Sequence, residues 1–119
     1  MTRARILIVE NAGIVARDLR QQLVAMGYEP VGHASSAEEA LVLADQLKPD
    51  LALMDIDLAG PMDGIAAAHI FRDRFAIPVV FLTAFASAPT VARAQLAEPF
   101  GFIVRPFAER ALHTVIESA

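Results

Sequence analysis

Short apolar runs alternate along this chain with longer segments in which apolar residues recur every three or four positions. The short runs predict buried strands, and the periodic segments predict helices. We expect strands at residues 6–9, 30–34, 51–54, 78–82 and 102–104, and helices at about 12–26, 35–47, 65–75 and 89–97 and in a last segment that ends near 118. This alternation is typical of an α/β fold, in which helices cover both faces of a parallel sheet.

Polar residues and glycines at the segment ends indicate where the predicted helices begin and end. For the first helix, Asn11 stands at the position of an N-cap and Gly27 at the position of a C-terminal glycine. Ser35 and Glu38 form a capping box that opens the second helix, and Ser87 precedes the fourth. Five strands and five helices, without an internal repeat or a linker, predict a single domain.

Four of the predicted strands run directly into polar residues. These residues are Glu10 and Asn11 after the first strand, Asp55 after the third, Thr83 after the fourth and Arg105 after the fifth. Because the carboxyl ends of parallel strands share one edge, where ligands of open α/β sheets bind, we expect these side chains to converge. Carboxylate and amide oxygens suit Mg²⁺, whereas a hydroxyl and a guanidinium suit a phosphoryl group. The pattern predicts a phosphoryl-transfer site in which the carboxylate of Asp55 is the nucleophile.

Each of these residues also has an ordinary structural interpretation. An aspartate such as Asp55 often caps a turn, and Asn11 is also the expected helix cap. A β-branched residue such as Thr83 commonly ends a strand, and Arg105 is suited to a surface ion pair. Their coincidence at the ends of separate strands of one sheet favours the phosphoryl site.

Composition narrows the class of protein. With 119 residues, 55% of them hydrophobic and 20% charged, the chain can bury a core of its own. A net charge of −4 gives no reason to expect nucleic acid or an anionic membrane as a partner. The absence of cysteine excludes disulfides and thiolate chemistry, and the three histidines lack metal-ligand spacing. No signal-peptide or membrane-spanning stretch is present, so we expect a cytoplasmic domain.

The chain resembles the receiver domains of two-component response regulators over essentially its whole length. The resemblance rests on residues 6–11, 49–56, 62–64, 81–84 and 99–107, in this order and spacing. It implies a flavodoxin-like doubly wound parallel sheet with strand order 2-1-3-4-5 and five helices. It also implies one receiver domain over residues 1–119, with no output domain in this chain.

The resemblance assigns the phosphoacceptor and the metal ligands. Asp55 would take a phosphoryl group from a phosphohistidine on a histidine kinase or a histidine phosphotransfer protein. Mg²⁺ would be held by Glu10, Asn11, Asp55 and the main-chain carbonyl of Asp57. Such a domain phosphorylates and dephosphorylates itself only, so it is not expected to be an enzyme that turns over a substrate.

The resemblance also assigns a switch. Thr83 would hydrogen-bond the phosphoryl group, Phe102 would swing inward with it, and Arg105 would supply the fixed cation. The peptide between Arg105 and Pro106 would be cis. This movement would alter the surface of the fourth helix, fifth strand and fifth helix, which would bind an effector or a second copy of the chain. Residues expected on that surface are Arg93, Phe102 and Glu109.

Two positions depart from the family pattern. The family usually has a second acid where this chain has Asn11, so we predict weaker binding of Mg²⁺. It has lysine where this chain has Arg105, and guanidinium and ammonium are not interchangeable at a tight site. The only lysine, Lys48, is expected at the opposite end of the sheet. These departures leave open a receiver-like interaction module that works without phosphorylation.

A third interpretation is a phosphatase similar to the haloacid dehalogenases, which use the sequence D-x-D after a strand. Asp55, Ile56 and Asp57 match that motif. However, the motif of those enzymes belongs on the first catalytic strand, with a downstream lysine and a cap. This chain has the motif on its third strand and is too short for a cap, so the interpretation is remote.

Overall fold

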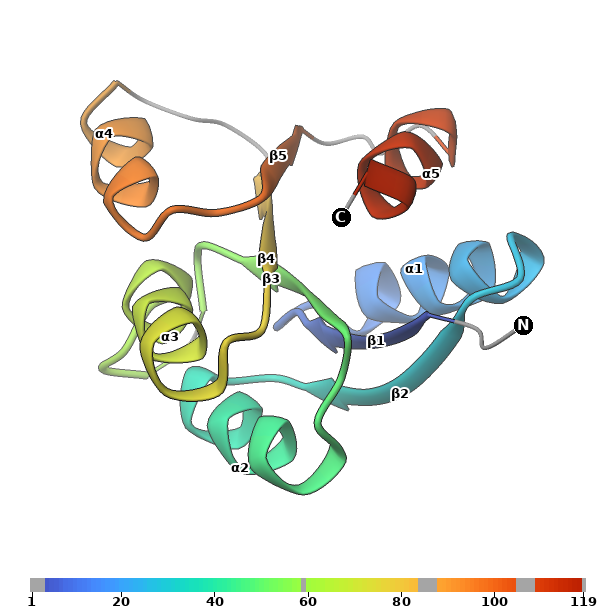
Figure 1. Cartoon of the computed structure of the whole chain (residues 1–119), viewed down its shortest axis with the longest axis horizontal. Coiled ribbons are helices and arrows are strands. Elements are labelled where there is room, and N and C mark those ends of the chain that lie inside the picture. The colour runs from blue at the N-terminus through green and yellow to red at the C-terminus, as the bar shows by residue number, and fades with distance from the viewer. Residues whose placement is uncertain (1–3, 59, 84–87, 105–108, 119) are drawn as a thin grey trace.

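A five-stranded parallel sheet forms the middle layer of the molecule, with helices on both of its faces (Figure 1). The computed structural model describes residues 4–58, 60–83, 88–104 and 109–118. The strands are β1 (Arg5–Val9), β2 (Glu29–Ala34), β3 (Leu51–Asp55), β4 (Val79–Thr83) and β5 (Gly101–Val104), in the order β2-β1-β3-β4-β5. The predicted doubly wound sheet with this strand order is therefore confirmed.

In the described part of the chain, four α-helices and one π-helical turn connect the strands, and a fifth α-helix follows β5. They are α1 (Gly13–Ala25), α2 (Ala37–Leu47), α3 (Gly64–Ile70), the π-helical turn η1 (Phe71–Phe75), α4 (Ala88–Leu96) and α5 (Glu109–Ser118). The helix expected at 65–75 is present, but its last turn has the wider π-helical winding of η1. None of the helices described is long and apolar enough to cross a bilayer.

The sheet separates two hydrophobic cores. Helices α1 and α5 cover one face, and α2, α3 and α4 cover the other (Figure 1). Residues of β1 alternate between the two cores, since Ile6 and Ile8 pack toward α1 while Leu7 and Val9 pack toward α2. Burial on both faces is typical of strands inside a covered parallel sheet, and β1 pairs there with β3.

The predicted N-cap of the first helix is wrong. Ala12, and not Asn11, occupies the N-cap position of α1, and no side chain caps that end of the helix. The main-chain N–H of Ala12 donates to Oε1 of Glu10 at 3.1 Å, so the turn that leads into α1 is bonded to the preceding acid. The other end of α1 agrees with the prediction, since Gly27 has a φ of +89°.

The capping box of the second helix lies one residue later than predicted. Oγ of Ser36 accepts the main-chain N–H of Glu39 at 3.2 Å, and Oε1 of Glu39 accepts the N–H of Ser35 at 2.7 Å. Helix α2 starts at Ala37, and a stripe of small residues on it is buried against the core. Burial of this stripe favours the observed helix start over a start capped by Ser35 and Glu38. The stripe consists of Ala37, Ala40 and Ala44. The expected cap at Ser87 lies outside the described residues.

The start of α3 packs directly on the end of β3. The N–H of Gly64 donates to the carbonyl of Ile56 at 2.9 Å, and a Cβ on Gly64 would overlap the main-chain oxygen of Asp55. Asp63 caps the helix, because its Oδ1 accepts the N–H of Ala66 at 2.9 Å. A glycine is required here by the close approach of two backbones.

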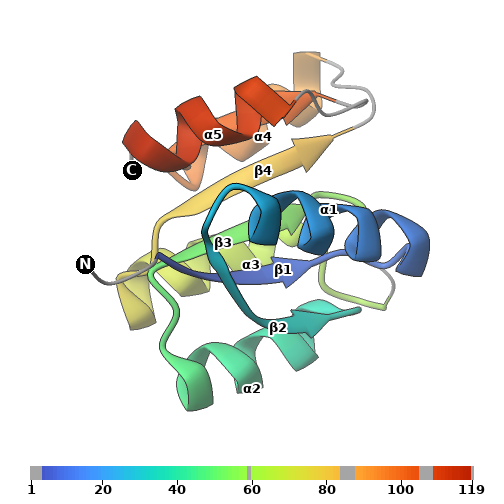
Figure 2. The ribbon, with the colours of Figure 1, turned by 90° about the vertical axis from the view of Figure 1, so that its right-hand side faces the viewer.

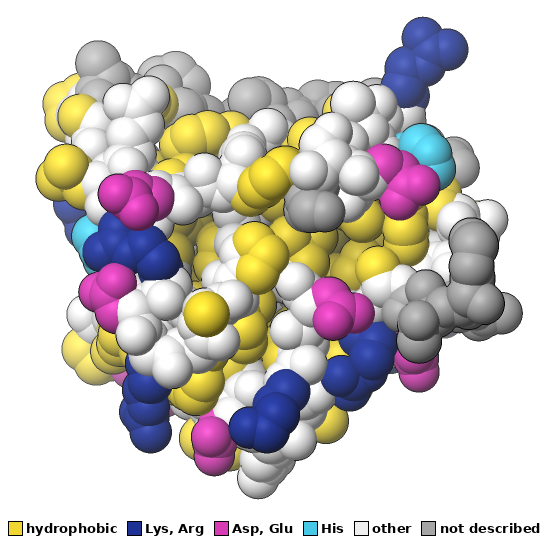
Figure 3. Space-filling view, in the orientation of Figure 1, with side chains coloured by type: hydrophobic (Ala, Val, Ile, Leu, Met, Phe, Trp, Pro, Cys, Tyr) yellow, Lys and Arg dark blue, Asp and Glu magenta, His cyan; other side chains and the backbone are white. Residues whose placement is uncertain are grey.

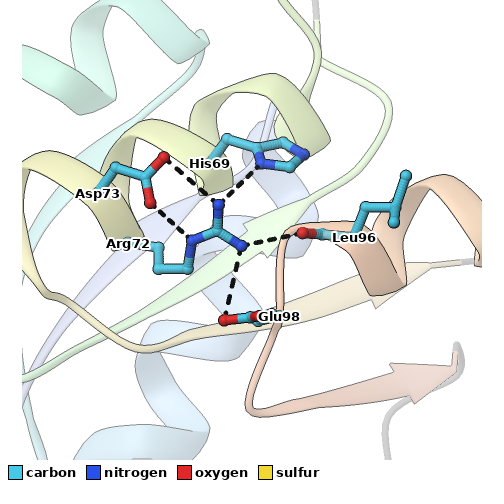
Figure 4. Close-up of polar contacts among 5 residues, drawn as sticks. All are labelled: His69, Arg72, Asp73, Leu96 and Glu98. Atoms are coloured by element: carbon cyan, nitrogen blue, oxygen red, sulfur yellow. Dashed lines mark hydrogen bonds and ion pairs between the residues drawn. The ribbon is translucent and has the colours of Figure 1, made fainter.

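A cluster of polar side chains fastens the C-terminal end of α4 to η1 (Figure 4). The guanidinium of Arg72 donates to the main-chain oxygen of Leu96 at 2.9 Å and to Oδ1 of Asp73 at 2.8 Å. An oxygen of Glu98 lies 3.7 Å from the same guanidinium. The hydrogen bond between Arg72 and Asp73 raises the pKa of Arg72 and lowers the pKa of Asp73.

Acidic and basic side chains are interspersed on the face of the molecule seen in Figure 3.

Tyr28 fastens α5 to the start of β2. Its side chain is buried, and the hydroxyl lies 3.2 Å from Nδ1 of His113. Burial, followed by a hydrogen bond and the negative charge of Glu117, raises the pKa of Tyr28 to about 12. The neutral phenol is therefore favoured by the folded state.

The close approach at Gly64 generates the first testable prediction. The substitution Gly64→Ala should lower the free energy of unfolding by about 2 kcal/mol, because the new methyl group forces α3 away from Asp55. Urea denaturation measures this change. Gly13→Ala is the matched control, since a Cβ there meets no atom within 4 Å. Equal stability of the two variants would contradict the close packing of α3 on β3.

Tyr28 generates a prediction for alkaline pH. Because the folded pKa is about 12 and the ordinary value is 10.0, stability is complete below pH 10 and falls as the pH rises through 12. The loss should reach about 3 kcal/mol at most, and Tyr28→Phe should abolish it. Tyr28 is the only tyrosine and there is no tryptophan, so tyrosinate absorbance reports its titration directly. A midpoint near 10 in the folded protein would refute this.

Candidate functional site

Two buried acids lie at the same level of neighbouring strands. Val9 of β1 pairs with Met54 of β3, so Glu10 and Asp55 each stand one residue further along. Only 1% of Glu10 and 7% of Asp55 is exposed. Because β1 and β3 run in the same direction (Figure 2) and neighbouring strands lie about 5 Å apart, both acids reach the carboxyl edge together.

Hydrogen bonds to main-chain and side-chain groups hold Glu10. Its own N–H donates to the carbonyl of Ala34 at 3.0 Å, and its Oε1 accepts from Ala12. Nε2 of His33 lies 2.9 Å from the carbonyl oxygen of Glu10. The sequence showed only that the histidines lack metal-ligand spacing, and it gave no sign of this contact, which joins residues 23 positions apart.

The turn after β3 folds back onto Asp55. The N–H of Asp57 donates to Oδ1 of Asp55 at 3.1 Å, and the side chain of Asp57 is exposed. The hydrogen bond orients the Asp55 carboxylate. Gly64 packs behind the main-chain oxygen of the same residue, so Asp55 is held from both sides.

Thr83 lies on the other side of Asp55. Asp55 pairs with Leu82 of β4, and Thr83 is the next residue of that strand. Only 3% of Thr83 is exposed. Thr83 in turn pairs with Val104 of β5, the residue before Arg105. Arg105 and the predicted cis peptide to Pro106 lie outside the described residues.

Phe102 is half-buried on β5. Its ring centroid lies 5.7 Å from that of Phe81, with 38° between the ring planes, and it borders the core under α2, α3 and α4. The residue therefore has an aromatic neighbour at the edge of the core.

The expected switch surface has an anchor that the sequence did not indicate. Nη2 of Arg93 on α4 donates to Oδ2 of Asp63, the cap of α3, at 3.0 Å. Arg93 is thus engaged with α3, while the side chain of Glu109 lies outside the described residues. The sequence can identify Asp63 as a helix cap. Its separation from Arg93 along the chain does not predict that the two side chains bind each other.

The oxygen donors at this edge suit a divalent cation that keeps part of its water shell. Glu10 and Asp55 supply carboxylates, Asn11 an exposed amide and Asp57 a main-chain carbonyl. Across the described residues, no cluster of three histidines, cysteines or acids forms a metal site. The donor set therefore fits Mg²⁺ with one carboxylate fewer than a site of three acids would offer.

A cavity of about 500 Å³ lies at the opposite end of the sheet. Lys48, Pro49 and Asp50 from the loop before β3 line it together with Phe75. This cavity is remote from Asp55, and it places Lys48 away from the carboxyl edge, as expected from the sequence. Lys48 is therefore no substitute for a cation beside Asp55.

Comparisons with known proteins agree with this arrangement. The family model described as "Response regulator receiver domain" matches residues 6–117. The transcriptional regulatory protein PdtaR of Mycobacterium tuberculosis is 39% identical over 115 residues, which are 97% of this chain and 56% of that protein. The phyllosphere-induced regulator PhyR of Methylorubrum extorquens is 32% identical over 96% of this chain and 42% of that protein.

Solved structures share the fold. The receiver domain of a modulated diguanylate cyclase from Desulfovibrio desulfuricans superposes with a TM-score of 0.95 at 37% identity, over 99% of this chain and 94% of that one. The chain spans about half the length of the curated relatives PdtaR and PhyR. The match over residues 6–117, the strand order and the relatives lead to one conclusion: this chain belongs to the response regulator receiver domains of two-component signalling.

Proposed function

We propose that this receiver domain is a phosphorylation switch in which Asp55 accepts a phosphoryl group. The donor would be a phosphohistidine on a histidine kinase or a histidine phosphotransfer protein. The observation that carries the proposal is the burial of Glu10 and Asp55 at one level of adjacent strands, with Thr83 on the neighbouring strand. Burying two charged carboxylates side by side carries a large desolvation cost, which a cation bound between them would offset.

In the transfer step, an oxygen of the Asp55 carboxylate attacks phosphorus while the bond from phosphorus to the imidazole nitrogen breaks. The imidazole leaves with the bonding electron pair and later takes a proton from water. The N–H of Asp57 donates to Oδ1 of this carboxylate. That hydrogen bond fixes the rotation of the carboxylate, so the attacking oxygen is oriented before the donor arrives.

Glu10, Asp55, the amide oxygen of Asn11 and the main-chain carbonyl of Asp57 would hold Mg²⁺. When bound, the ion neutralises the negative charge that gathers as the phosphoryl group approaches a carboxylate. An amide brings no charge, so Asn11 makes the site weaker than one with a second acid. Arg105 would supply the remaining positive charge.

The switch would run from Asp55 to α4 through contacts that the fold provides. Gly64 packs on the main-chain oxygen of Asp55, Asp63 precedes it as the helix cap, and Arg93 of α4 binds that cap. The hydroxyl of Thr83 would donate to a phosphoryl oxygen, and Phe102 would follow it inward. A group carrying about −1.5 to −2 charges would thereby alter the surface of α4, β5 and α5, where an effector or a second copy would bind.

Two other functions have weaker support. A receiver-like module that works without phosphorylation is favoured by the exposure of Asn11, since that residue is neither buried beside Glu10 nor used as a cap. The phosphatase interpretation loses its support, because the family model covers residues 6–117 and Asp55 ends the third strand. The relatives include a transcriptional regulatory protein and a modulated diguanylate cyclase, so their outputs differ.

Phosphorylation of Asp55 is tested by the intact mass of the protein after incubation with Mg²⁺ and acetyl phosphate. The parent should gain one phosphoryl group, and Asp55→Asn should gain none. Asp45→Asn, which makes the same change at an exposed position of α2, should behave as the parent. A folded parent that gains nothing in excess Mg²⁺ would support the module without phosphorylation, and a gain by Asp55→Asn would place the acceptor elsewhere.

The position of Asn11 generates a prediction for metal affinity. Asn11→Asp should tighten Mg²⁺ binding by about tenfold, since it adds a charge beside the dication, while Asn11→Ala should weaken it. Calorimetric titration of the three proteins with MgCl₂ measures both changes. Identical affinities would show that residue 11 does not contact the ion, and Arg105→Lys would then be the remaining change to test.

A further inference from the structure

His33 lies next to the site on the edge strand β2. It pairs with Ile8 of β1, and the ladder between these strands ends at Val9 and Ala34. Beyond that point β2 leaves the sheet toward α2. The imidazole Nε2 reaches back across the strands to the carbonyl oxygen of Glu10 at 2.9 Å.

The partner settles which nitrogen carries the proton. A carbonyl oxygen only accepts, so Nε2 of His33 must be the donor in this contact. The side chain thereby supplies an N–H at the point where the strand ladder ends. Glu10 is then bonded to β2 through both main-chain groups, its N–H to Ala34 and its carbonyl to His33.

Fixing both main-chain groups fixes the direction in which the Glu10 side chain leaves β1. Its Oε1 accepts the N–H of Ala12, which sets the rotation of the carboxylate as well. Glu10 is 1% exposed, so its side chain has little room to find another position. Without the bond from His33, the peptide after Glu10 could rotate and carry the N–H of Asn11 with it.

We propose that His33 is a positioning residue for the metal site, which acts by holding the main chain of Glu10 through the hydrogen bond from Nε2. The inference rests on the proposed function, because it concerns how tightly this chain's oxygens bind Mg²⁺. Groups that orient metal ligands commonly change metal affinity by about 10–100-fold when they are removed. His33 acts through a main-chain carbonyl, so we expect the lower end of that range.

The test compares variants that remove or keep the donor. His33→Leu and His33→Val remove the N–H, and His33→Gln retains an N–H at a similar reach. The Mg²⁺ dissociation constant of each folded protein is measured by calorimetry. It should rise about tenfold in the first two variants and stay close to the parent value in His33→Gln. His69→Leu, which removes an imidazole from α3, should have no effect.

Phosphoryl uptake from acetyl phosphate gives a second readout. His33→Leu should be slow at limiting Mg²⁺ and should recover the parent rate when Mg²⁺ is in excess, since the Asp55 nucleophile is unchanged. The inference is overturned if His33→Leu and His33→Val bind Mg²⁺ as the parent does. It is also overturned if His33→Gln loses as much affinity as they do, because the donor would then be irrelevant.

The two proposals fail in different ways. A parent that binds Mg²⁺ but gains no phosphoryl group contradicts the proposed function, while the affinity ratio of parent to His33→Leu still decides the role of His33. A parent that binds no Mg²⁺ contradicts both.

Discussion

Two carboxylates buried beside each other repel, and the carboxyl edge of this sheet is arranged around that constraint. Glu10 and Asp55 are fixed by the parallel register of β1 and β3, so neither can move away without breaking the strand pairing. Main-chain donors from Ala12 and Asp57 offset part of the loss of hydration. A cation would supply what these dipoles do not. The interaction of two fixed acids with a divalent ion is thus the basis of the proposed switch.

The same constraint explains why the surrounding backbone is packed so tightly. Gly64 is pressed against the main-chain oxygen of Asp55, so a displacement of the Asp55 turn must be felt at the start of α3. In the proposed switch, Asp63 would pass this displacement to Arg93 of α4. The C-terminal end of α4 is fastened by the bond from Arg72 to the carbonyl of Leu96. Helix α4 is therefore held at two points, of which only the first lies next to the site. The proposed switch would use these contacts to link a charge at Asp55 to a surface on α4.

Sequence reasoning predicted the fold and the convergence of the acids because both follow from short apolar runs and the residue after each run. It failed where two structural needs compete for one residue. Asn11 is a good helix cap by type, yet the Glu10 side chain takes the N–H that leads into α1. The capping box was predicted at Ser35 but lies at Ser36, because burial of the alanine stripe determines where α2 starts. The contact of His33 with Glu10 depends on where β2 leaves the sheet, which no local pattern encodes.

The central claim is that Asp55 and Glu10 form one site for a phosphoryl group and a divalent ion. A crystal structure with Mg²⁺ and beryllofluoride, an analogue of the phosphoryl group, tests this most directly. The account predicts the analogue on an oxygen of Asp55. It predicts that Mg²⁺ contacts Asp55 and at least one of Glu10 and Asn11. An analogue bound to another residue, or an ion that contacts neither Glu10 nor Asn11, would contradict it.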